Sequence, residues 1–421
     1  MTLPMIAIVG AAGQMTSITA LALAETATDH RLRLLDINTT EMRRLYAHLP
    51  TSRAETLGLD LGIEADLRAS LAGAALVIHG AGPFHKTAAP VRAMCLELGI
   101  DYLDIDDDVE STLEAIALDA PAKAAGVALY VGHGASPGFT NMLALDLLRR
   151  FDEPRTVEVA WTVGDEGKTE LGRAVAEHTM HIGAGPCLTW RDGHAVTRES
   201  YGSSQVFPMG QNLGDYRLYE SAHPEPVTLP WSFRQLREAS CWGGLHPQAN
   251  NGLLRGLAVA QTQGRLTMDE ACGFLQAVLH DEFGTLKGWR AAFGGMLSQI
   301  RRGENDWSNL RQTLWNAARG VHGPMLSGMA ARVAGRRNGL DLALVRQCVA
   351  RQPAGFADSM ARITGLSAAA FALMVLLGPK QSGFKPPESW ADPDQFYQLC
   401  AALGGHPDQP VVGPIMEAFK S

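Results

Sequence analysis

The feature that most constrains the fold is a short apolar run that ends in a turn of small residues. Residues 5–9 (MIAIV) contain no polar side chain, and they lead into Gly10-Ala11-Ala12-Gly13 and then into the helix-forming stretch 16–25. Such a run fits a strand of a parallel sheet that is covered on both faces. A turn without side chains lets a diphosphate approach the backbone, where free N–H groups and the positive end of the helix dipole hold its charge. The stretch therefore predicts a dinucleotide-binding turn.

Small residues suit any tight turn between a strand and a helix, so a second signal is needed, and the next strand supplies it. The run RLRLLDIN (31–38) ends at Asp36, about the distance downstream where the dinucleotide fingerprint has an acidic residue. This carboxylate can accept hydrogen bonds from both ribose hydroxyls of NAD. It would repel the 2′-phosphate of NADP by at most ~4 kcal/mol at ~4 Å and an effective dielectric constant of ~20. Arg43 and Arg44 follow closely and would soften this preference, so we expect NAD, with NADP second.

The pattern continues as alternating strands and helices, which predicts a doubly wound parallel sheet of six strands. Further strands are expected at 55–61, 75–79, 101–106 and 127–134, and helices at 64–71, 88–98 and 110–125. Ligands of open parallel sheets bind beyond the carboxyl ends of the strands. The residues predicted to bind the cofactor therefore follow four strands: Gly10, Ala12, Gly13, Gln14 and Met15; Asp36 and Ile37; Asp60 and Leu61; and Gly80, Ala81, Gly82, Pro83 and Phe84.

The charge distribution and the cysteines indicate which kind of partner the protein binds and in which compartment it lies. The net charge of −8 is spread without long blocks of like charge, which predicts no nucleic-acid and no membrane partner and favours a small-molecule substrate. The six cysteines lie far apart without a C-x-x-C pair, which is typical of thiols in a reducing cytosol. The N-terminal stretch lacks a basic leader region. We expect a cytoplasmic protein.

Two longer stretches carry a further signal: GAGPFHKTAAPVRAMCLELGIDYLDIDDD (80–108) and GHGASPGFTNMLALDLL (132–148). Both resemble the saccharopine dehydrogenase family. A Gly-Pro-Phe loop, a helix with a cysteine, a Tyr-Asp strand end, and a Pro-Gly turn before an asparagine follow one another in that family in this order. The resemblance covers about the first 150 residues, and 206–230 and 376–404 are similar to later parts. One departure is Thr16, where a glycine or alanine usually ends the fingerprint, so we expect the first helix to pack slightly further from its strand.

The resemblance implies an α/β fold whose N-terminal Rossmann domain (1–145) is followed by an α+β substrate and oligomerisation domain (146–355). The remaining segment (356–421) should pack back on the first domain through a closing helix near 356–377. Strand-like residues at 156–163 and 187–192 agree with a mixed sheet in the second domain, and helical patterns dominate from about 231 to 355. The family's substrate site lies between the domains, and we expect a homodimer.

The resemblance also implies hydride transfer between a nicotinamide cofactor and the C–N bond of an amino acid or an opine-like, saccharopine-type secondary amine. A carbonyl or enoyl reductase on the same scaffold is an alternative, because fold does not fix function. A non-catalytic NAD-binding sensor is another.

Interconversion of amine and imine needs a group that moves a proton. We take His85, Lys86 and Asp106 as the catalytic candidates. His85 and Lys86 follow the glycine-proline turn at a strand end, although capping or solvation is an equally good reading of both. Asp106 crowds another strand end with two further aspartates, so mutual repulsion should raise the pKa of at least one of them; solvated loop carboxylates are the alternative.

Three residues are predicted to bind substrate: His133, Arg173 and His178. His133 lies at the end of the last strand, and Arg173, like Arg191, offers a guanidinium to a substrate carboxylate. His178 and His181 have i, i+3 spacing beside Glu177, but no third ligand is evident in the sequence. We therefore expect no metal.

Overall fold

The computed structural model describes residues 3–164, 172–210, 213–279, 282–319, 326–349 and 354–418. The chain divides into two compact units. The first unit comprises the described residues within 1–146 and 352–412, and the second those within 147–351 and 413–421. The first unit thus combines the beginning of the chain with a segment near its end.

A parallel seven-stranded sheet forms the centre of the first unit, in the order β15-β6-β5-β4-β1-β2-β3. The central strand β1 pairs with β2 on one side and β4 on the other, and every residue from Ile6 to Val9 is buried. This burial on both faces is what the apolar run predicts. The strands are β1 (Met5–Val9), β2 (Arg31–Asp36), β3 (Ala54–Gly58), β4 (Ala74–His79), β5 (Asp101–Asp104), β6 (Ala128–Tyr130) and β15 (Gly383–Lys385).

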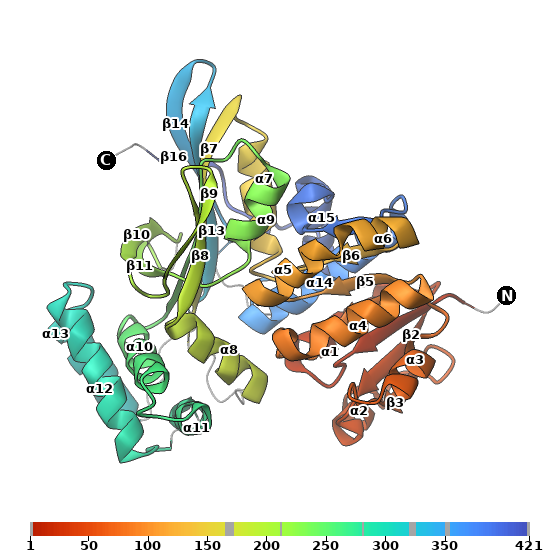
Figure 1. Ribbon diagram of the computed structural model, residues 1–421, viewed down its shortest axis with the longest axis horizontal. Coiled ribbons are helices and arrows are strands. Elements are labelled where there is room, and N and C mark those ends of the chain that lie inside the picture. Colours follow the sequence, from red (N-terminus) through yellow and green to blue (C-terminus); the bar gives the residue numbers. More distant parts are fainter. Residues whose placement is uncertain are drawn as a thin grey trace. The chain divides into compact units, whose positions relative to one another are not determined.

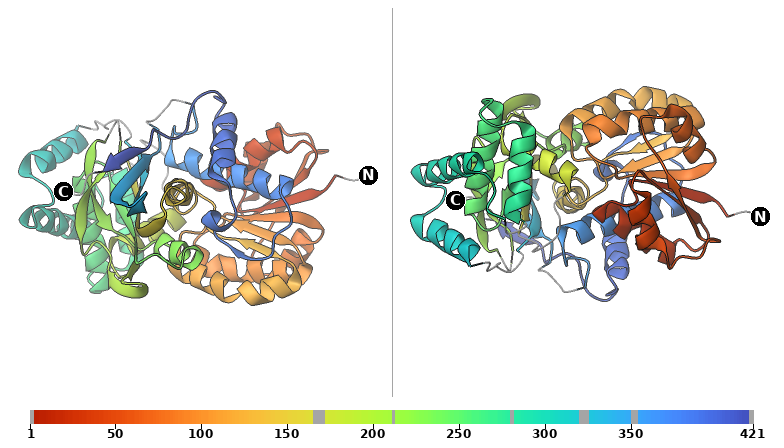
Figure 2. Two further views of the ribbon diagram at one scale, coloured as in Figure 1. Left: turned by 90° about the horizontal axis from the view of Figure 1, so that it is seen from above. Right: turned by 90° about the horizontal axis from the view of Figure 1, so that it is seen from below.

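Helices cover both faces of this sheet. Figures 1 and 2 show α4 and α5 on one face and α1 and α14 on the other. The helices of the first unit are α1 (Gln14–Thr26), α2 (Thr39–Tyr46), α3 (Glu64–Leu71), α4 (Phe84–Leu98), α5 (Val109–Ala117), α6 (Asp119–Ala125), α7 (Phe139–Leu148), α14 (Met360–Leu377) and α15 (Pro393–Leu403), with a 3-10 turn at Pro387–Ser389. The predicted α/β fold class is confirmed.

The segment near the end of the chain returns to the first sheet in two ways. The strand β15 pairs in parallel with β6 and adds a seventh strand to the six expected. The closing helix α14 packs on α1, where the buried hydroxyl of Thr19 donates to the carbonyl of Gly365 at 2.9 Å. A Cβ atom at Gly365 would lie 2.5 Å from the carbonyl oxygen of Met15, so the glycine permits this close approach. The contact with α14 thus holds α1, the helix that follows the first glycine turn, in place.

Among the described residues, α14 is also the one helix that is long and apolar enough to cross a membrane, judged by length and composition alone. The structure buries 67% of this stretch inside the protein. Its neighbours α1 and α15 contact it within the first unit. This is the environment of a core helix.

Two helix boundaries differ from expectation. The helix α4 begins at Phe84 rather than near residue 88, so His85 and Lys86 lie in its first turn and not in a loop. Pro83 occupies the N-cap position, and the helix continues through Pro90, which lacks an N–H group for the preceding turn. The expected helix 110–125 is divided at Leu118 into α5 and α6.

A mixed nine-stranded sheet forms the second unit, in the order β10-β11-β12-β7-β13-β14-β16, with β8 joined to β12 and β9 joined to β8. Its central pair β12 and β7 is parallel, and β13 runs antiparallel to β7. The strands are β7 (Glu153–Val163), β8 (Pro186–Arg191), β9 (His194–Glu199), β10 (Ser204–Pro208), β11 (Asp215–Glu220), β12 (Glu238–Leu245), β13 (Gly328–Arg337), β14 (Leu340–Gln347) and β16 (Met416–Ala418).

The stretch 231–355 is less helical than expected, because it also contributes the strands β12, β13 and β14. The helices of the second unit are α8 (Arg173–Gly183), α9 (Glu225–Ser232), α10 (Ala249–Thr262), α11 (Met268–Leu279), α12 (Leu286–Arg301) and α13 (Trp307–Ala318). On one face of the sheet, Trp242 packs in a buried cluster with Phe207 and Leu218. Neighbouring residues of a strand point to opposite faces. Cys241 therefore faces the other side of β12, where α9 contacts this strand.

Candidate active site

The first glycine turn has the geometry of a diphosphate cradle. Gly10 has φ +80°, and its N–H donates to the carbonyl of Leu35 at 2.8 Å. A Cβ atom at Gly10 would lie 2.6 Å from the backbone nitrogen of Ala81, so both the conformation and the contact require glycine. The helix α1 starts at Gln14 with no side-chain cap and no acidic residue in its first turn. Its first N–H groups therefore remain available for an anion.

The second glycine loop lies directly against the first. The N–H of Gly80 donates to the carbonyl of Val9 at 2.9 Å. The hydroxyl of Thr87 lies 2.5 Å from the carbonyl oxygen of Ala81 and 3.1 Å from that of Pro83. These contacts fix the loop 80–84 at the carboxyl edge of the sheet, beside the first turn, as the strand order predicts.

The unusual Thr16 is accommodated by this second loop. A Cβ atom at Gly80 would overlap the hydroxyl of Thr16, and the Oγ1 atom lies 3.5 Å from the carbonyl oxygen of Gly80. Thr16 is 3% exposed. The missing side chain at position 80 thus makes room for the larger residue at position 16.

Asp36 lies at the first glycine turn, where the fingerprint predicts it. One carboxylate oxygen accepts from the N–H of Ala12 at 2.9 Å, and the other accepts from the N–H of Asn38 at 2.8 Å. These bonds orient the carboxylate while it remains half-buried. Of the two arginines that follow, Arg44 pairs with Glu41 at 2.5 Å and Arg43 is exposed. A carboxylate held in this way is suited to accept hydrogen bonds from ribose hydroxyls.

The remaining predicted cofactor residues lie at the ends of β2 and β3. Ile37 is 76% exposed, which is unusual for a large apolar side chain and suits contact with an adenine ring. Asp60 is exposed, and its Oδ1 atom accepts from the N–H of Gly62 at 2.9 Å. Leu61 is half-buried next to it. Two open hollows of about 400 and 500 Å³ lie elsewhere, over 184–186 and over α3.

His85 is paired with a carboxylate that the sequence did not single out. Its backbone N–H and its Nδ1 atom lie 2.9 and 3.1 Å from the same oxygen of Asp108. Asp108 is 7% exposed, whereas the His85 side chain is 29% exposed. When Nδ1 donates to Asp108, the Nε2 atom on the opposite side of the ring can take part in proton transfer. We call this pair the His85–Asp108 dyad.

A buried charge network holds the turn that carries Asp108. The guanidinium of Arg92 donates to Asp106 at 2.5 Å and to the hydroxyl of Ser111 at 2.6 Å, and it lies 3.5 Å from Asp104. The other oxygen of Asp106 accepts from the N–H of Asp108 at 2.9 Å. Arg92, Asp104 and Asp106 are all 0% exposed.

This burial corrects two expectations about the aspartates. Asp104 and Asp106 are not solvated loop carboxylates. Burial is the main cause that raises the pKa of both, and repulsion by Asp104 adds to it for Asp106. Without solvent access and bound to Arg92, Asp106 has the position of a residue that holds the dyad in place rather than one that meets a substrate. Lys86 is exposed in the first turn of α4, beside His85.

His133 is a core histidine. It is 0% exposed, and its Nε2 atom accepts from the indole N–H of Trp390 at 3.0 Å. The rings of Tyr130 and Phe371 pack edge-on against it. Burial lowers the pKa of His133 to about 3, so the ring is neutral. The structure therefore corrects the expectation that His133 faces a substrate.

The predicted substrate residues of the second unit already have protein partners. Arg173 donates to Glu177 at 2.8 Å and to Asp269 at 2.5 Å, and Arg191 donates to Glu238 and Glu220 at 2.7 and 2.9 Å. These pairs occupy the guanidinium groups that were expected to bind a substrate carboxylate. The helix α8 also carries His178 and His181. The ring of His178 is half-buried and lies 5.8 Å from the ring of His223, whereas His181 is exposed.

Comparison with known proteins agrees with this geometry. Residues 6–129 match the family model of the saccharopine dehydrogenase NADP-binding domain. No curated protein matches the chain. Among solved structures, the apo histidine-tagged saccharopine dehydrogenase (L-Glu forming) from Saccharomyces cerevisiae has a TM-score of 0.62 at 12% identity, over 99% of this chain and 100% of that one.

A second solved structure is GenD2 from gentamicin A biosynthesis in complex with NAD, with a TM-score of 0.39 at 11% identity over 100% of this chain and 97% of that one. The yeast structure and the family model confirm the resemblance that the glycine loops predict. Residues 6–129 are therefore similar to the saccharopine dehydrogenase NADP-binding domain, and the fold of the chain is similar to that of the yeast saccharopine dehydrogenase.

Proposed function

We propose that the protein is an NAD(P)-dependent dehydrogenase that acts on the C–N bond of an amino acid or an opine-like, saccharopine-type secondary amine. The observation that carries this proposal is the His85–Asp108 dyad, which directly follows the second glycine loop at the carboxyl edge of the sheet. A carboxylate-oriented histidine at this place supplies the proton transfer that amine oxidation requires. The likeness to a saccharopine dehydrogenase supports the choice of the C–N bond.

The residues at the strand ends fit a nicotinamide dinucleotide. The uncapped start of α1 leaves its first N–H groups for a diphosphate, and the close contact of Gly10 with the backbone of Ala81 fixes the turn that precedes them. Asp36 would accept from the adenosine ribose, and Ile37 would contact the adenine. We propose NAD as the preferred cofactor, because the oriented Asp36 carboxylate disfavours a 2′-phosphate and Arg44 is engaged by Glu41. The matching family model is named for NADP binding, so the preference for NAD has to be tested by titrating the protein with both nucleotides.

The bound cofactor supplies a hydride acceptor in one direction and a hydride donor in the other. In the oxidative direction the carbon beside nitrogen loses its hydride, and the Nε2 atom of His85 accepts the proton that leaves the amine nitrogen. Asp108 stabilises the resulting imidazolium. Water then adds to the imine, and the amine and carbonyl products separate. Arg92 and Asp106 act as positioning residues, because they hold the backbone of Asp108.

Lys86 is proposed as a second group that meets the substrate. It is exposed one residue after His85, in the same helical turn, where an ammonium group suits a substrate carboxylate. We also propose a homodimer in the cytoplasm with a small-molecule substrate and no nucleic-acid or membrane partner. The six buried free thiols support a reducing compartment.

The test is a turnover assay of the full chain in both directions. NAD⁺ is offered with amino acids and opine-type amines, and NADH is offered with 2-keto acids and amines. Amine-dependent turnover that is lost in His85→Gln, with NADH binding retained, supports the proposal. Turnover of a carbonyl compound without amine would indicate a carbonyl reductase instead. Nucleotide binding without turnover of any substrate would indicate a sensor.

A further inference from the structure

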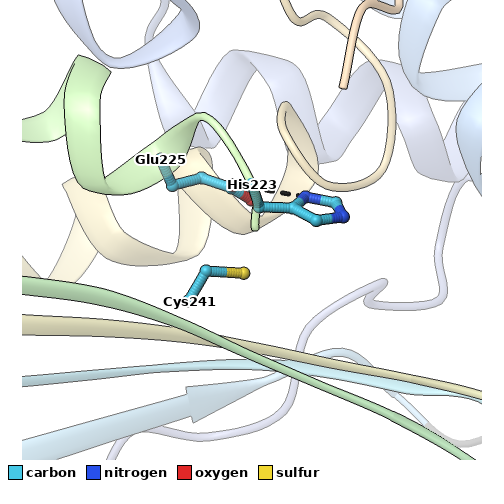
Figure 3. Close-up of side chains that lie close together, drawn as sticks. All are labelled: His223, Glu225 and Cys241. Atoms are coloured by element: carbon cyan, nitrogen blue, oxygen red, sulfur yellow. Dashed lines mark ion pairs between the residues drawn. The ribbon is translucent and has the colours of Figure 1, made fainter. Parts of the chain in front are cut away.

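A second group of chemically reactive side chains lies in the second unit, where the proposed dehydrogenase chemistry does not use it. It consists of His223, Glu225 and Cys241, which we call the His-Glu-Cys cluster. His223 belongs to the connection between β11 and α9, Glu225 is the first residue of α9, and Cys241 lies in the middle of β12. Figure 3 shows the three side chains converging from these three segments.

The cluster is compact and excluded from solvent. One potential ligand atom from each residue lies within 4.8 Å of the others. The exposed fractions are 4% for His223, 0% for Glu225 and 1% for Cys241. Separate stretches of chain thus bring a nitrogen, an oxygen and a sulfur donor to one buried point.

The buried imidazole of His223 has one nitrogen without a hydrogen bond among the described residues. The Nδ1 atom of His223 lies 3.4 Å from Oε2 of Glu225, which is an ion-pair distance. It makes no hydrogen bond with any residue that the structure describes. Leaving a buried polar atom in this state is costly. A cation between the three donors would give the imidazole nitrogen of His223 the partner that it lacks.

The donor set indicates which cation fits. Thiolate, imidazole and carboxylate together suit Zn²⁺, whereas Mg²⁺ and Ca²⁺ prefer oxygen ligands alone. Zinc sites with three protein ligands keep a fourth position for water. We propose that the His-Glu-Cys cluster binds one zinc-type divalent ion, and that binding releases the proton of the Cys241 thiol. This departs from the expectation of no metal, which was based on His178 and His181.

A thiol nucleophile activated by His223 is the competing interpretation, and the structure disfavours it. Cys241 is 1% exposed in the interior of β12, so a substrate has no route to its sulfur. The indole ring of Trp161 lies 5.2 Å from the imidazole of His223, and His178 lies edge-on to the same imidazole at 5.8 Å. These rings pack against the imidazole, which is 4% exposed, so a substrate does not reach His223 either.

The experiment measures metal content and spectroscopy of the full chain. Protein is loaded with Zn²⁺, dialysed and analysed for bound metal, and a second sample is loaded with Co²⁺ to detect the charge-transfer absorption of a thiolate ligand. The variants are Cys241→Ser and His223→Gln. Cys187→Ser is the matched control, because Cys187 is also a buried thiol of this sheet, on β8, and lies outside the cluster.

We expect one Zn²⁺ per chain in the unmodified protein and in Cys187→Ser, and a loss of affinity of about tenfold or more in the two cluster variants. Equal loss in Cys187→Ser, or no retained zinc in the unmodified protein, would overturn the proposal. If Cys241→Ser does not fold, the Co²⁺ spectrum of the unmodified protein decides, because absence of a thiolate band contradicts ligation by Cys241. None of these readouts depends on dehydrogenase activity.

Discussion

Replacing Asp108 by asparagine isolates the charge of the dyad, because the amide keeps the shape and one acceptor oxygen. At 3.1 Å, a carboxylate and an imidazolium attract each other by about 5 kcal/mol at an effective dielectric constant of about 20 and by about 1 kcal/mol in water. The His85 side chain is 29% exposed and Asp108 is buried, so an intermediate value of about 3 kcal/mol applies. If the transition state carries the imidazolium, this corresponds to a loss of about 10²-fold in kcat.

The assay is steady-state turnover with the best amine substrate, together with a fluorescence titration of NADH. Asp108→Asn should lower kcat and leave NADH affinity unchanged, because the dyad lies beyond the diphosphate turn. Glu110→Gln is the matched control: it removes a nearby exposed carboxylate at the start of α5. An unchanged kcat in Asp108→Asn, or an equal loss in Glu110→Gln, would refute the assigned role of the charge.

Three further predictions concern the cofactor site and the core. Asp36→Ala should raise the affinity for NADPH relative to NADH by about tenfold, measured by paired fluorescence titrations; an unchanged ratio contradicts the role of the carboxylate. Gly80→Ala should lower the free energy of unfolding, measured in urea, by about 1–3 kcal/mol, because the new methyl group overlaps the Thr16 hydroxyl. A second change, Thr16→Ser, keeps this hydroxyl and would not remove the overlap, whereas Thr16→Gly would remove it. The protein should lose stability as the pH falls from about 6.5 towards about 3, because buried His133 stays neutral in the folded protein and takes up a proton only in the unfolded chain. The urea midpoint of the unmodified protein should therefore fall more steeply with decreasing pH than that of His133→Gln. Equal slopes would contradict this prediction.

The cofactor half of the site could be predicted from sequence because its signals are local. The apolar run, the glycine turn and Asp36 lie within about thirty residues, and each follows from strand and turn chemistry. The start of α4 could not be predicted as well, because Pro83 and Pro90 both suggest interruptions, whereas one is an N-cap and the other is tolerated inside the helix. The strand β15 was missed because three residues carry no periodicity.

The partners of the histidines could not be predicted, because the fold supplies them from distant positions. Asp108 lies 23 residues from His85, and only the neighbouring ends of β4 and β5 bring them together. The cluster of aspartates after β5 was the available signal. His133 resembles a site residue in the sequence, but its partner Trp390 lies 257 residues away and belongs to the core.

Binding of the dinucleotide at the first glycine turn can be measured by titrating the full chain with NADH, followed by protein fluorescence, for the unmodified protein and for Gly10→Ala. The variant places a methyl group 2.6 Å from the Ala81 nitrogen in a left-handed backbone position, so the cradle cannot keep its shape. We predict saturable binding of one NADH per chain, which is lost in the variant while the circular dichroism spectrum is retained. Absence of binding to the unmodified protein, or equal binding to a folded Gly10→Ala, would contradict it.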